Sequence, residues 1–209
     1  MKTIGILGGI ASGKSAATDV LRSLGAVVFD ADQAGHQVLR LPEVKEEIRA
    51  RFSPAVFDEQ GEVSRRKVAE RVFGPTAQHV EALTDLEKIT HPRIKIELVA
   101  AQEAARQEGA PAFVIDAPVM IKAGWHRRCD LIVFVEASRA SRLARAQARS
   151  WTENEFDRRE ASQEELEVKR ALADFIVTND SSLACLADQI QTFWSQHITP
   201  LPSFRGIPQ

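Results

Sequence analysis

The sequence contains few cysteines: Cys129 and Cys185 are the only two among 209 residues. They lie far apart and outside any Cys-x-x-Cys or cysteine-histidine spacing, so the pattern favours neither a disulfide framework nor a zinc site. Two buried or incidental thiols in a reducing compartment are the simpler interpretation.

Long apolar runs and an excess of positive charge are also missing. No apolar run is long enough to span a membrane, and the N-terminus has no basic stretch followed by an apolar one. The formal net charge is -2 and the sequence pI is about 6.2, so no overall positive field would hold nucleic acid or an anionic membrane. We therefore expect a cytoplasmic protein, a monomer or weak homo-oligomer, that binds phosphates only locally.

Short apolar runs alternate with amphipathic stretches over most of the chain, which predicts an α/β fold with a parallel sheet flanked by helices. With 209 residues and 44% hydrophobic composition, the chain can bury one substantial core that carries insertions. Five strands are predicted, at residues 3–7, 26–29, 112–115, 131–135 and 175–177. Helices are predicted between them at residues 14–24, 139–149 and 183–194.

The interval from residue 33 to about 109 breaks this alternation, because it carries helical patterns at residues 44–52 and 65–73 and no convincing strand. It is predicted to be a helical lobe inserted into one domain of residues 1–209, whose core comprises about 1–32 and 110–200. Pro92 should begin a new helix there, which puts His91 at a helix boundary. The three prolines of residues 199–209 predict an extended tail.

The strongest motif is a P-loop, residues 8–15, which reads Gly-Gly-Ile-Ala-Ser-Gly-Lys-Ser and fits G-x-x-x-x-G-K-[ST] between a strand and a helix. Glycines let backbone amides approach a phosphate, and Lys14 in the first helical turn opposes the helix dipole unless an anion is bound. Ser15 would place its hydroxyl on Mg²⁺. The alternative is a glycine-rich turn with an exposed lysine. Residues predicted to bind ATP here are Gly8, Gly9, Ala11, Ser12, Gly13, Lys14, Ser15 and Ala16.

Carboxylates follow two of the predicted strands. Asp30 and Asp32 close the second strand, and their spacing of two puts both on one side if the strand persists. A carboxylate there can accept the proton of an attacking hydroxyl or help to hold Mg²⁺. Alternatively, Asp32 caps a helix that begins near Gln33. Asp116 ends the third strand, where it would lie near the metal.

Arginines gather on the predicted helix at residues 139–149. Arg139, Arg142, Arg145 and Arg149 follow one side of it, and no acidic residue occurs between positions 137 and 151. An unneutralised arginine stripe favours a phosphate clamp over a solvated helix face or an RNA-binding surface. The segment of about residues 145–170 is rich in charge and poor in apolar side chains, which predicts a lid that closes over the reaction.

In their order and spacing, these residues resemble the dephospho-coenzyme A kinase family from the P-loop through to Asn179. The matching pieces after the P-loop are Phe29-Asp30-Ala31-Asp32, Val63-Ser64-Arg65 with Val72-Phe73, His91-Pro92, Asp116-Ala117-Pro118, Asp130, Arg145 with Arg149, Gln163, Lys169, and Ala173-Asp174 with Asn179. The resemblance implies transfer of the γ-phosphoryl group of ATP to the ribose 3′-hydroxyl of dephospho-coenzyme A, which is the last step of coenzyme A synthesis.

The resemblance also implies roles for single residues. Asp32 would be the general base, and Lys14 with Arg149 would stabilise the moving phosphoryl group. Arg145 and Asn179 would border the adenine of ATP. The acceptor would be bound by Asp30, Arg65, His91 and Asp116. For His91, the equal alternative is a histidine at a helix boundary whose hydrogen bonds are satisfied within the protein and which does not bind the acceptor.

The chain departs from the family at Lys122, which stands where the family usually has a glutamate. Smaller departures are Ala11 for a loop glycine and Ala16 for a threonine, and neither removes a backbone amide. Because a fold alone does not determine the acceptor, Lys122 keeps open another small-molecule kinase. A nucleotide-binding switch ATPase is the remaining alternative, although the sequence has no Asn-Lys-x-Asp run and no carboxylate pair ending the third strand.

Overall fold

The computed structural model describes residues 1–74 and 76–198, and it contains a five-stranded sheet of strand order β2-β3-β1-β4-β5. β1 pairs in parallel with both β3 and β4, and β4 pairs in parallel with β5. The predicted α/β class and all five predicted strands are therefore confirmed. The strands are β1 (Lys2–Gly8), β2 (Val27–Asp30), β3 (Ala112–Asp116), β4 (Leu131–Glu136) and β5 (Phe175–Thr178).

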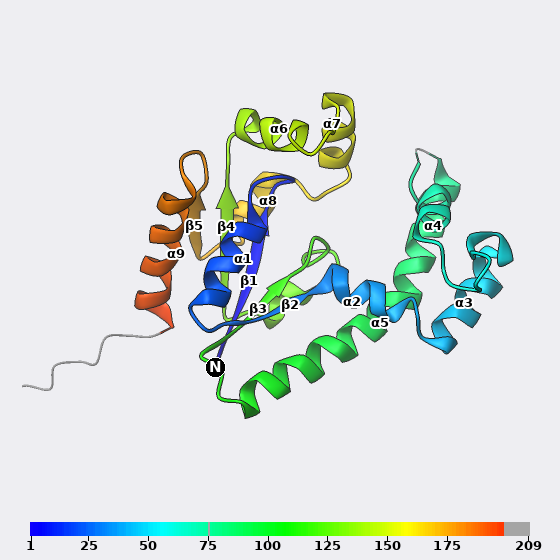
Figure 1. Cartoon of the computed structure of the whole chain (residues 1–209), viewed down its shortest axis with the longest axis horizontal. Helices are drawn as coiled ribbons and strands as arrows, with labels where there is room; N and C mark the ends of the chain where they lie inside the picture. Colours follow the sequence, from blue (N-terminus) through cyan, green and yellow to red (C-terminus); the bar gives the residue numbers. More distant parts are fainter. Residues whose placement is uncertain (75, 199–209) are drawn as a thin grey trace, which may run out of the picture. The chain divides into compact units, whose positions relative to one another are not determined.

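Two helices, α1 (Lys14–Ser23) and α9 (Leu183–His197), cover one face of this sheet (Figure 1). Ile4 and Val114 of the sheet pack in one buried cluster with Leu21 of α1 and Phe193 of α9. Full burial of such side chains contributes roughly 1.5–3 kcal/mol each. The sheet and these two helices therefore form the framework that holds the loops at the carboxyl ends of the strands.

The chain divides into two compact units. The first, called here the core unit, comprises Met1–Phe29 and the chain from Glu103 onward. After β3 it contains a short 3-10 helix, η2 (Trp125–Arg128), and after β4 three further helices. These helices lie beyond the carboxyl end of β4 (Figure 1), and they are α6 (Arg139–Gln147), α7 (Glu153–Ala161) and α8 (Leu166–Ala171).

The second unit, called here the helical unit, comprises Asp30–Gln102. Its own buried side chains include Val44, Ile48, Val68 and Leu98. After Asp30, the last residue of β2, the described part of this unit has β structure only in an isolated bridge between Phe57 and Val63, so the predicted helical character is confirmed. Its elements are α2 (Ala31–Val38), α3 (Pro42–Phe52), η1 (Pro54–Val56), α4 (Arg65–Val72) and most of α5 (Ala77–Gln107).

The prediction that Pro92 begins a new helix is wrong. Pro92 lies inside α5, so His91 is within a helix and not at its boundary. Close to the proline, Arg93 Nη1 donates to the carbonyl oxygen of Ile89 at 3.0 Å. This bond does not replace the lost one, because Pro92 leaves the carbonyl oxygen of Lys88, four residues earlier, without its helical amide donor. Burial of Leu98 on the next turns shows that tertiary packing holds the helix past the proline.

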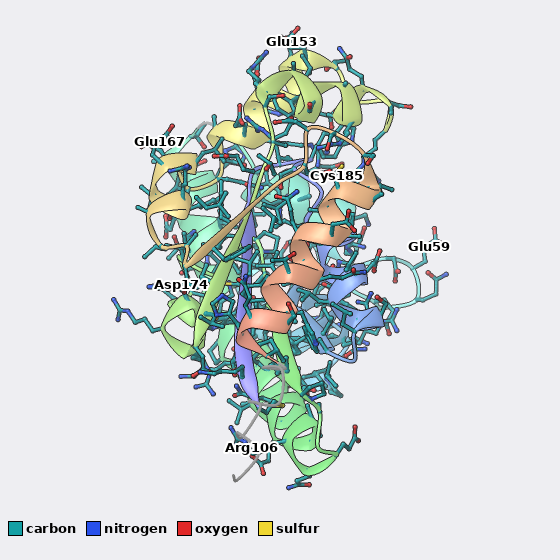
Figure 2. All side chains as sticks on the ribbon, turned by 90° about the vertical axis from the view of Figure 1, so that its left-hand side faces the viewer. Glu59, Arg106, Glu153, Glu167, Asp174 and Cys185 are labelled. Atoms are coloured by element: carbon teal, nitrogen blue, oxygen red, sulfur yellow. The ribbon has the colours of Figure 1, made fainter. Side chains whose placement is uncertain are left out.

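Neither cysteine is paired: Cys129 is half-buried, and Cys185 is exposed in the first turn of α9 (Figure 2). In the part of the chain that the structure describes, no helix has the length and hydropathy needed to cross a membrane. The tail predicted at residues 199–209 lies outside the described residues.

Candidate functional site

The P-loop connects β1 to α1, and two of its glycines are required by their surroundings. Gly13 adopts the left-handed φ of 99° directly before α1, and a Cβ there would lie 2.1 Å from Asn179 Nδ2. A Cβ at Gly8 would lie 2.5 Å from Ser12 Oγ. No side chain larger than hydrogen fits at either position. The loop can therefore bring backbone amides close to an anion at the beginning of α1.

Ala11 of the P-loop is strained, because it is a non-glycine residue with a φ of 57°. We expect Ala11→Gly to raise the free energy of unfolding by about 0.5–1 kcal/mol, since the relief of strain exceeds the extra unfolded-state entropy of glycine. Urea denaturation of the ligand-free protein measures this change. The matched control is Ala16→Gly inside α1, which should lower the free energy of unfolding by about 0.5–1 kcal/mol. A less stable Ala11→Gly variant would contradict the strain.

Two side chains fasten the P-loop to the rest of the core unit. Arg145 of α6 donates from Nη1 to the carbonyl oxygens of Ala11 at 3.5 Å and Ser12 at 3.3 Å, and from Nη2 to the carbonyl oxygen of Asn179. Asn179, which follows β5, is 2% exposed and donates from Nδ2 to the carbonyl oxygen of Ser12 at 2.8 Å. The structure thus brings together Arg145, Asn179 and the P-loop, which the sequence predicted as parts of one nucleotide site.

Two buried polar atoms at this junction have no hydrogen-bond partner within the described residues: Ser12 Oγ and Asn179 Oδ1. Buried polar atoms are nearly always satisfied in folded proteins, so unsatisfied ones point to a missing ligand, water or rearrangement. Both atoms lie at the P-loop. A polar ligand bound there could complete their hydrogen bonds.

Lys14 is at the beginning of α1, and its Nζ lies 3.4 Å from the carbonyl oxygen of Gly9. The first turn of α1 has no acidic residue, so the positive end of the helix dipole and the lysine add together. Ser15, the next residue, is exposed. Asp116 is the register neighbour of Ile6, so it lies beside the strand that leads into the P-loop.

The residue after Asn179 anchors the beginning of α6. Asp180 accepts hydrogen bonds from the backbone amide of Ser138 at 2.9 Å and from its hydroxyl at 2.9 Å. Hydrogen bonds from Ser141 and Ser138 hold the pKa of the Asp180 carboxyl below its usual value. The segment after β5 therefore contacts both the P-loop and the helix that carries Arg145.

The arginines of α6 are not the unneutralised stripe that the sequence predicted. Arg139 pairs with Glu153 at 3.0 Å and with Asp157 at 2.7 Å, and buried Arg142 pairs with Glu160. These acidic partners come from α7, so the sequence of α6 and its immediate neighbours does not contain them. Two of the four arginines are thus committed to holding α7 against α6.

Within the segment predicted as a lid, residues 145–170, α7 packs against α6 through an aromatic ring. Phe156 of α7 is fully buried, and the guanidinium groups of Arg139 and Arg142 lie 5.6 and 5.5 Å from its ring centre. Arg149 lies just beyond α6 and is exposed. Within the described residues, its side chain has no hydrogen bond or ion pair, so it is available for a ligand.

A buried lysine of α8 belongs to the same region, although the sequence suggested no role for it. Lys169 is 3% exposed, and its Nζ donates to Gln163 Oε1 at 2.8 Å. Burial, and then the charges of Lys14 and Arg142, lower the pKa of Lys169 to about 8. Both Lys169 and Gln163 were among the residues of the family resemblance. In so charged a segment, the sequence pattern could not show which lysine is buried.

Asp30 and Asp32 belong to the helical unit, and the prediction that the second strand persists through Asp32 is wrong. β2 ends at Asp30, and α2 begins at Ala31. Asp30 is the N-cap, because its Oδ1 accepts a hydrogen bond from the Gln33 amide at 2.9 Å. The helix-cap alternative therefore holds for Asp30 and not for Asp32. Asp32 lies in the first turn of α2, where the helix dipole favours a carboxylate.

Arg65 begins α4 and lines a cavity of about 530 Å³ inside the helical unit. His36 and Arg40 also line this cavity, as does Lys45, which pairs with Glu62 at 2.5 Å. The lining therefore carries an excess of positive charge, which suits an anionic group. The third residue of this unit that is predicted to bind the acceptor, His91, is half-buried in α5.

Comparison with known proteins gives consistent matches over nearly the whole chain. A family model described as dephospho-CoA kinase matches residues 2–184. A dephospho-CoA kinase of Symbiobacterium thermophilum is 36% identical over 197 residues, which are 93% of this chain and 80% of that protein. The crystal structure of TT1252 from Thermus thermophilus is similar with a TM-score of 0.79 and 31% identity, covering 94% of this chain and 97% of that one.

A shikimate kinase from Acinetobacter baumannii is similar in fold alone. Its TM-score is 0.51 at 11% identity, with 94% of this chain and 92% of that chain covered. The overall fold is therefore shared with a protein whose sequence differs widely from this one.

Proposed function

The chain belongs to the dephospho-CoA kinase family, and on that basis we propose that it transfers the γ-phosphoryl group of ATP to the ribose 3′-hydroxyl of dephospho-coenzyme A. The observation that supports the proposal is the P-loop, whose enclosed glycines and Lys14 lie next to Arg145 and Asn179 in an arrangement suited to an anion. The family membership supplies the acceptor. A location in the cytoplasm and a monomeric or weakly associated state stay predictions of the sequence.

In this proposal the phosphates are bound by the P-loop amides and Lys14, and Arg145 with Asn179 borders the adenine. Exposed Arg149 stabilises charge on the moving phosphoryl group, and Asp32 accepts the proton of the attacking hydroxyl. Ser15 suits Mg²⁺ because its hydroxyl is a hard oxygen donor at the beginning of α1, and Asp32 is the second candidate ligand. When bound, Mg²⁺ neutralises charge on the outer phosphates.

The acceptor is proposed to contact Asp30, Arg65, His91 and Asp116. Support for Arg65 comes from the positive cavity that it lines in the helical unit. Dephospho-coenzyme A carries a pyrophosphate, and guanidinium groups bind phosphate oxygens with paired hydrogen bonds. Arg65 and Arg40 thus supply the type of group that such an acceptor requires.

The test of this function is ADP formation by the purified protein with MgATP, measured with and without dephospho-coenzyme A. We expect turnover that depends on the acceptor, and a product whose mass and chromatographic behaviour match coenzyme A. Shikimate and AMP serve as control acceptors and should give little ADP. Equal ADP formation without acceptor would favour a switch ATPase. Turnover with another acceptor, but not with dephospho-coenzyme A, would favour the different kinase that Lys122 keeps open.

A further inference from the structure

Lys169 is a buried cation that donates a hydrogen bond to a neutral partner. Its side chain is 3% exposed, and Nζ donates to the neutral amide oxygen of Gln163 at 2.8 Å. Within residues 1–74 and 76–198, no carboxylate forms an ion pair with it. An ammonium has three donors, and a buried charge is costly unless it is paired and hydrogen-bonded.

The charges around Lys169 do not cancel it. Lys14 of α1 and Arg142 of α6 lower its pKa, whereas Glu164 and Glu160 raise it. Glu160 is already paired with Arg142. These five groups together carry one excess positive charge, and the site holds that charge in a buried position.

Two further carboxylates line the cavity next to Lys169 but face solvent. They belong to Glu165 and Glu167, both of which are exposed, as is Glu164. Figure 2 shows Glu167 at the outer surface of α8. Carboxylates in water interact only weakly with a charge inside the protein, because solvent screens them. They therefore leave the buried ammonium without a close counter-ion.

The P-loop lies directly against the elements that surround Lys169. A Cβ at Gly9 would lie 3.0 Å from Leu166 Cδ2 and 3.1 Å from Arg142 Nη1. Lys169 follows Leu166 by three residues, so the two side chains share one side of α8. Gly9, Ile10 and Lys169 line a single cavity of about 380 Å³. The buried ammonium and the P-loop therefore face a common space.

We propose that Lys169 is a phosphate-binding residue, whose ammonium is positioned by Gln163 and contacts the terminal phosphate of a bound nucleoside triphosphate. The inference rests on the proposed function, because it concerns the same nucleotide. It adds to that function a cation from α8, which neither the P-loop motif nor the arginines of α6 supplies. The anionic phosphate supplies the counter-charge that the ligand-free site lacks.

A first consequence is that Lys169 destabilises the ligand-free protein at neutral pH. Its pKa is about 8 in the folded protein, against an ordinary 10.5. Because the folded value is the lower one, the penalty is complete below about pH 8 and disappears as the pH rises toward 10.5. Thermal unfolding should therefore give a higher Tm for Lys169→Met than for the wild type at pH 7, and no difference from this cause near pH 10.5.

The decisive measurement is proton uptake on nucleotide binding. Titration calorimetry with ATP and Mg²⁺ at pH 8.5, in two buffers of different ionisation enthalpy, counts the protons taken up. A phosphate beside Lys169 raises its pKa again, so the wild type should take up a measurable fraction of one proton. We expect no such uptake in Lys169→Met, together with about ten- to hundredfold weaker nucleotide binding. Lys169→Arg should bind nucleotide but take up no proton, because guanidinium is always charged.

The matched control is Arg170→Met, the next residue of α8, which is exposed and pairs with Glu136 at 2.9 Å. This variant should keep wild-type nucleotide affinity and proton uptake. Absence of proton uptake in the wild type, or unchanged affinity and uptake in Lys169→Met, would overturn the proposal. Failure of the proposed function would look different from failure of this inference. In that case nucleotide binding and proton uptake would persist, while dephospho-coenzyme A would not be phosphorylated.

Discussion

Replacement of Lys14 by alanine should lower the turnover number by at least about a thousandfold and leave the fold intact. Lys14 lies at the positive end of α1, in a first turn without an acidic residue, and its Nζ lies 3.4 Å from the Gly9 carbonyl oxygen. This position is suited to stabilising charge on a phosphoryl group in transfer. Steady-state ADP formation and thermal unfolding of the same preparation measure the two effects separately.

The matched control for Lys14 is Arg22→Ala, at the other end of α1. Arg22 is exposed and pairs with Asp19 at 2.5 Å, so its loss removes a positive charge from the same helix without touching the P-loop. The control should retain wild-type turnover. A folded Lys14→Ala variant with wild-type turnover would refute the assignment of the P-loop as the phosphate site.

Replacement of Asp32 by asparagine should lower turnover by about a hundred- to ten-thousandfold, because an amide cannot accept the proton of the attacking hydroxyl. Asp30→Asn should be mild, since asparagine caps a helix as well as aspartate does and Asp30 already serves as the cap of α2. Asp30→Ala should lower the free energy of unfolding by about 1 kcal/mol through loss of that cap.

A Mg²⁺ titration separates the two roles proposed for Asp32. If turnover of Asp32→Asn recovers at high Mg²⁺, Asp32 holds the metal and is not the base. If the variant stays inactive at saturating Mg²⁺ while it still binds both substrates, the proton-accepting role is supported. Wild-type turnover at low Mg²⁺ would exclude both roles.

Local features of the fold could be predicted from the sequence, because they depend on neighbours in the chain. The five apolar runs became strands, and the P-loop glycines lie where the motif requires them. The end of β2 was predicted wrongly, because it depends on one hydrogen bond. Asp30 accepts this bond from the Gln33 amide, and helix α2 begins one residue later. Period-two spacing alone could not distinguish a strand that continues from a strand that ends in a cap.

Features that depend on distant contacts could not be read from local patterns. The partner of Arg142 is Glu160, which lies eighteen residues away on another helix. The sequence around α6 therefore could not show that this arginine is neutralised. Helix α5 continues through Pro92, and Leu98 on its following turns is fully buried, so the packing of distant residues outweighs the local effect of the proline. Burial of Lys169 likewise depends on how α8 packs beside the P-loop.

The adjacency of Asn179 and Asp180 links two parts of the core unit through a single peptide bond. The Asn179 side chain donates a hydrogen bond to the P-loop, and the Asp180 side chain accepts one from the Ser138 amide at the beginning of α6. Because the peptide unit between them is planar and inextensible, α6 cannot slide away from the end of β5 without pulling on the carbonyl oxygen of Ser12. A displacement of the first turn of α6 would therefore also act on the P-loop. An insertion of one residue between these two would separate the two contacts while leaving every side chain present.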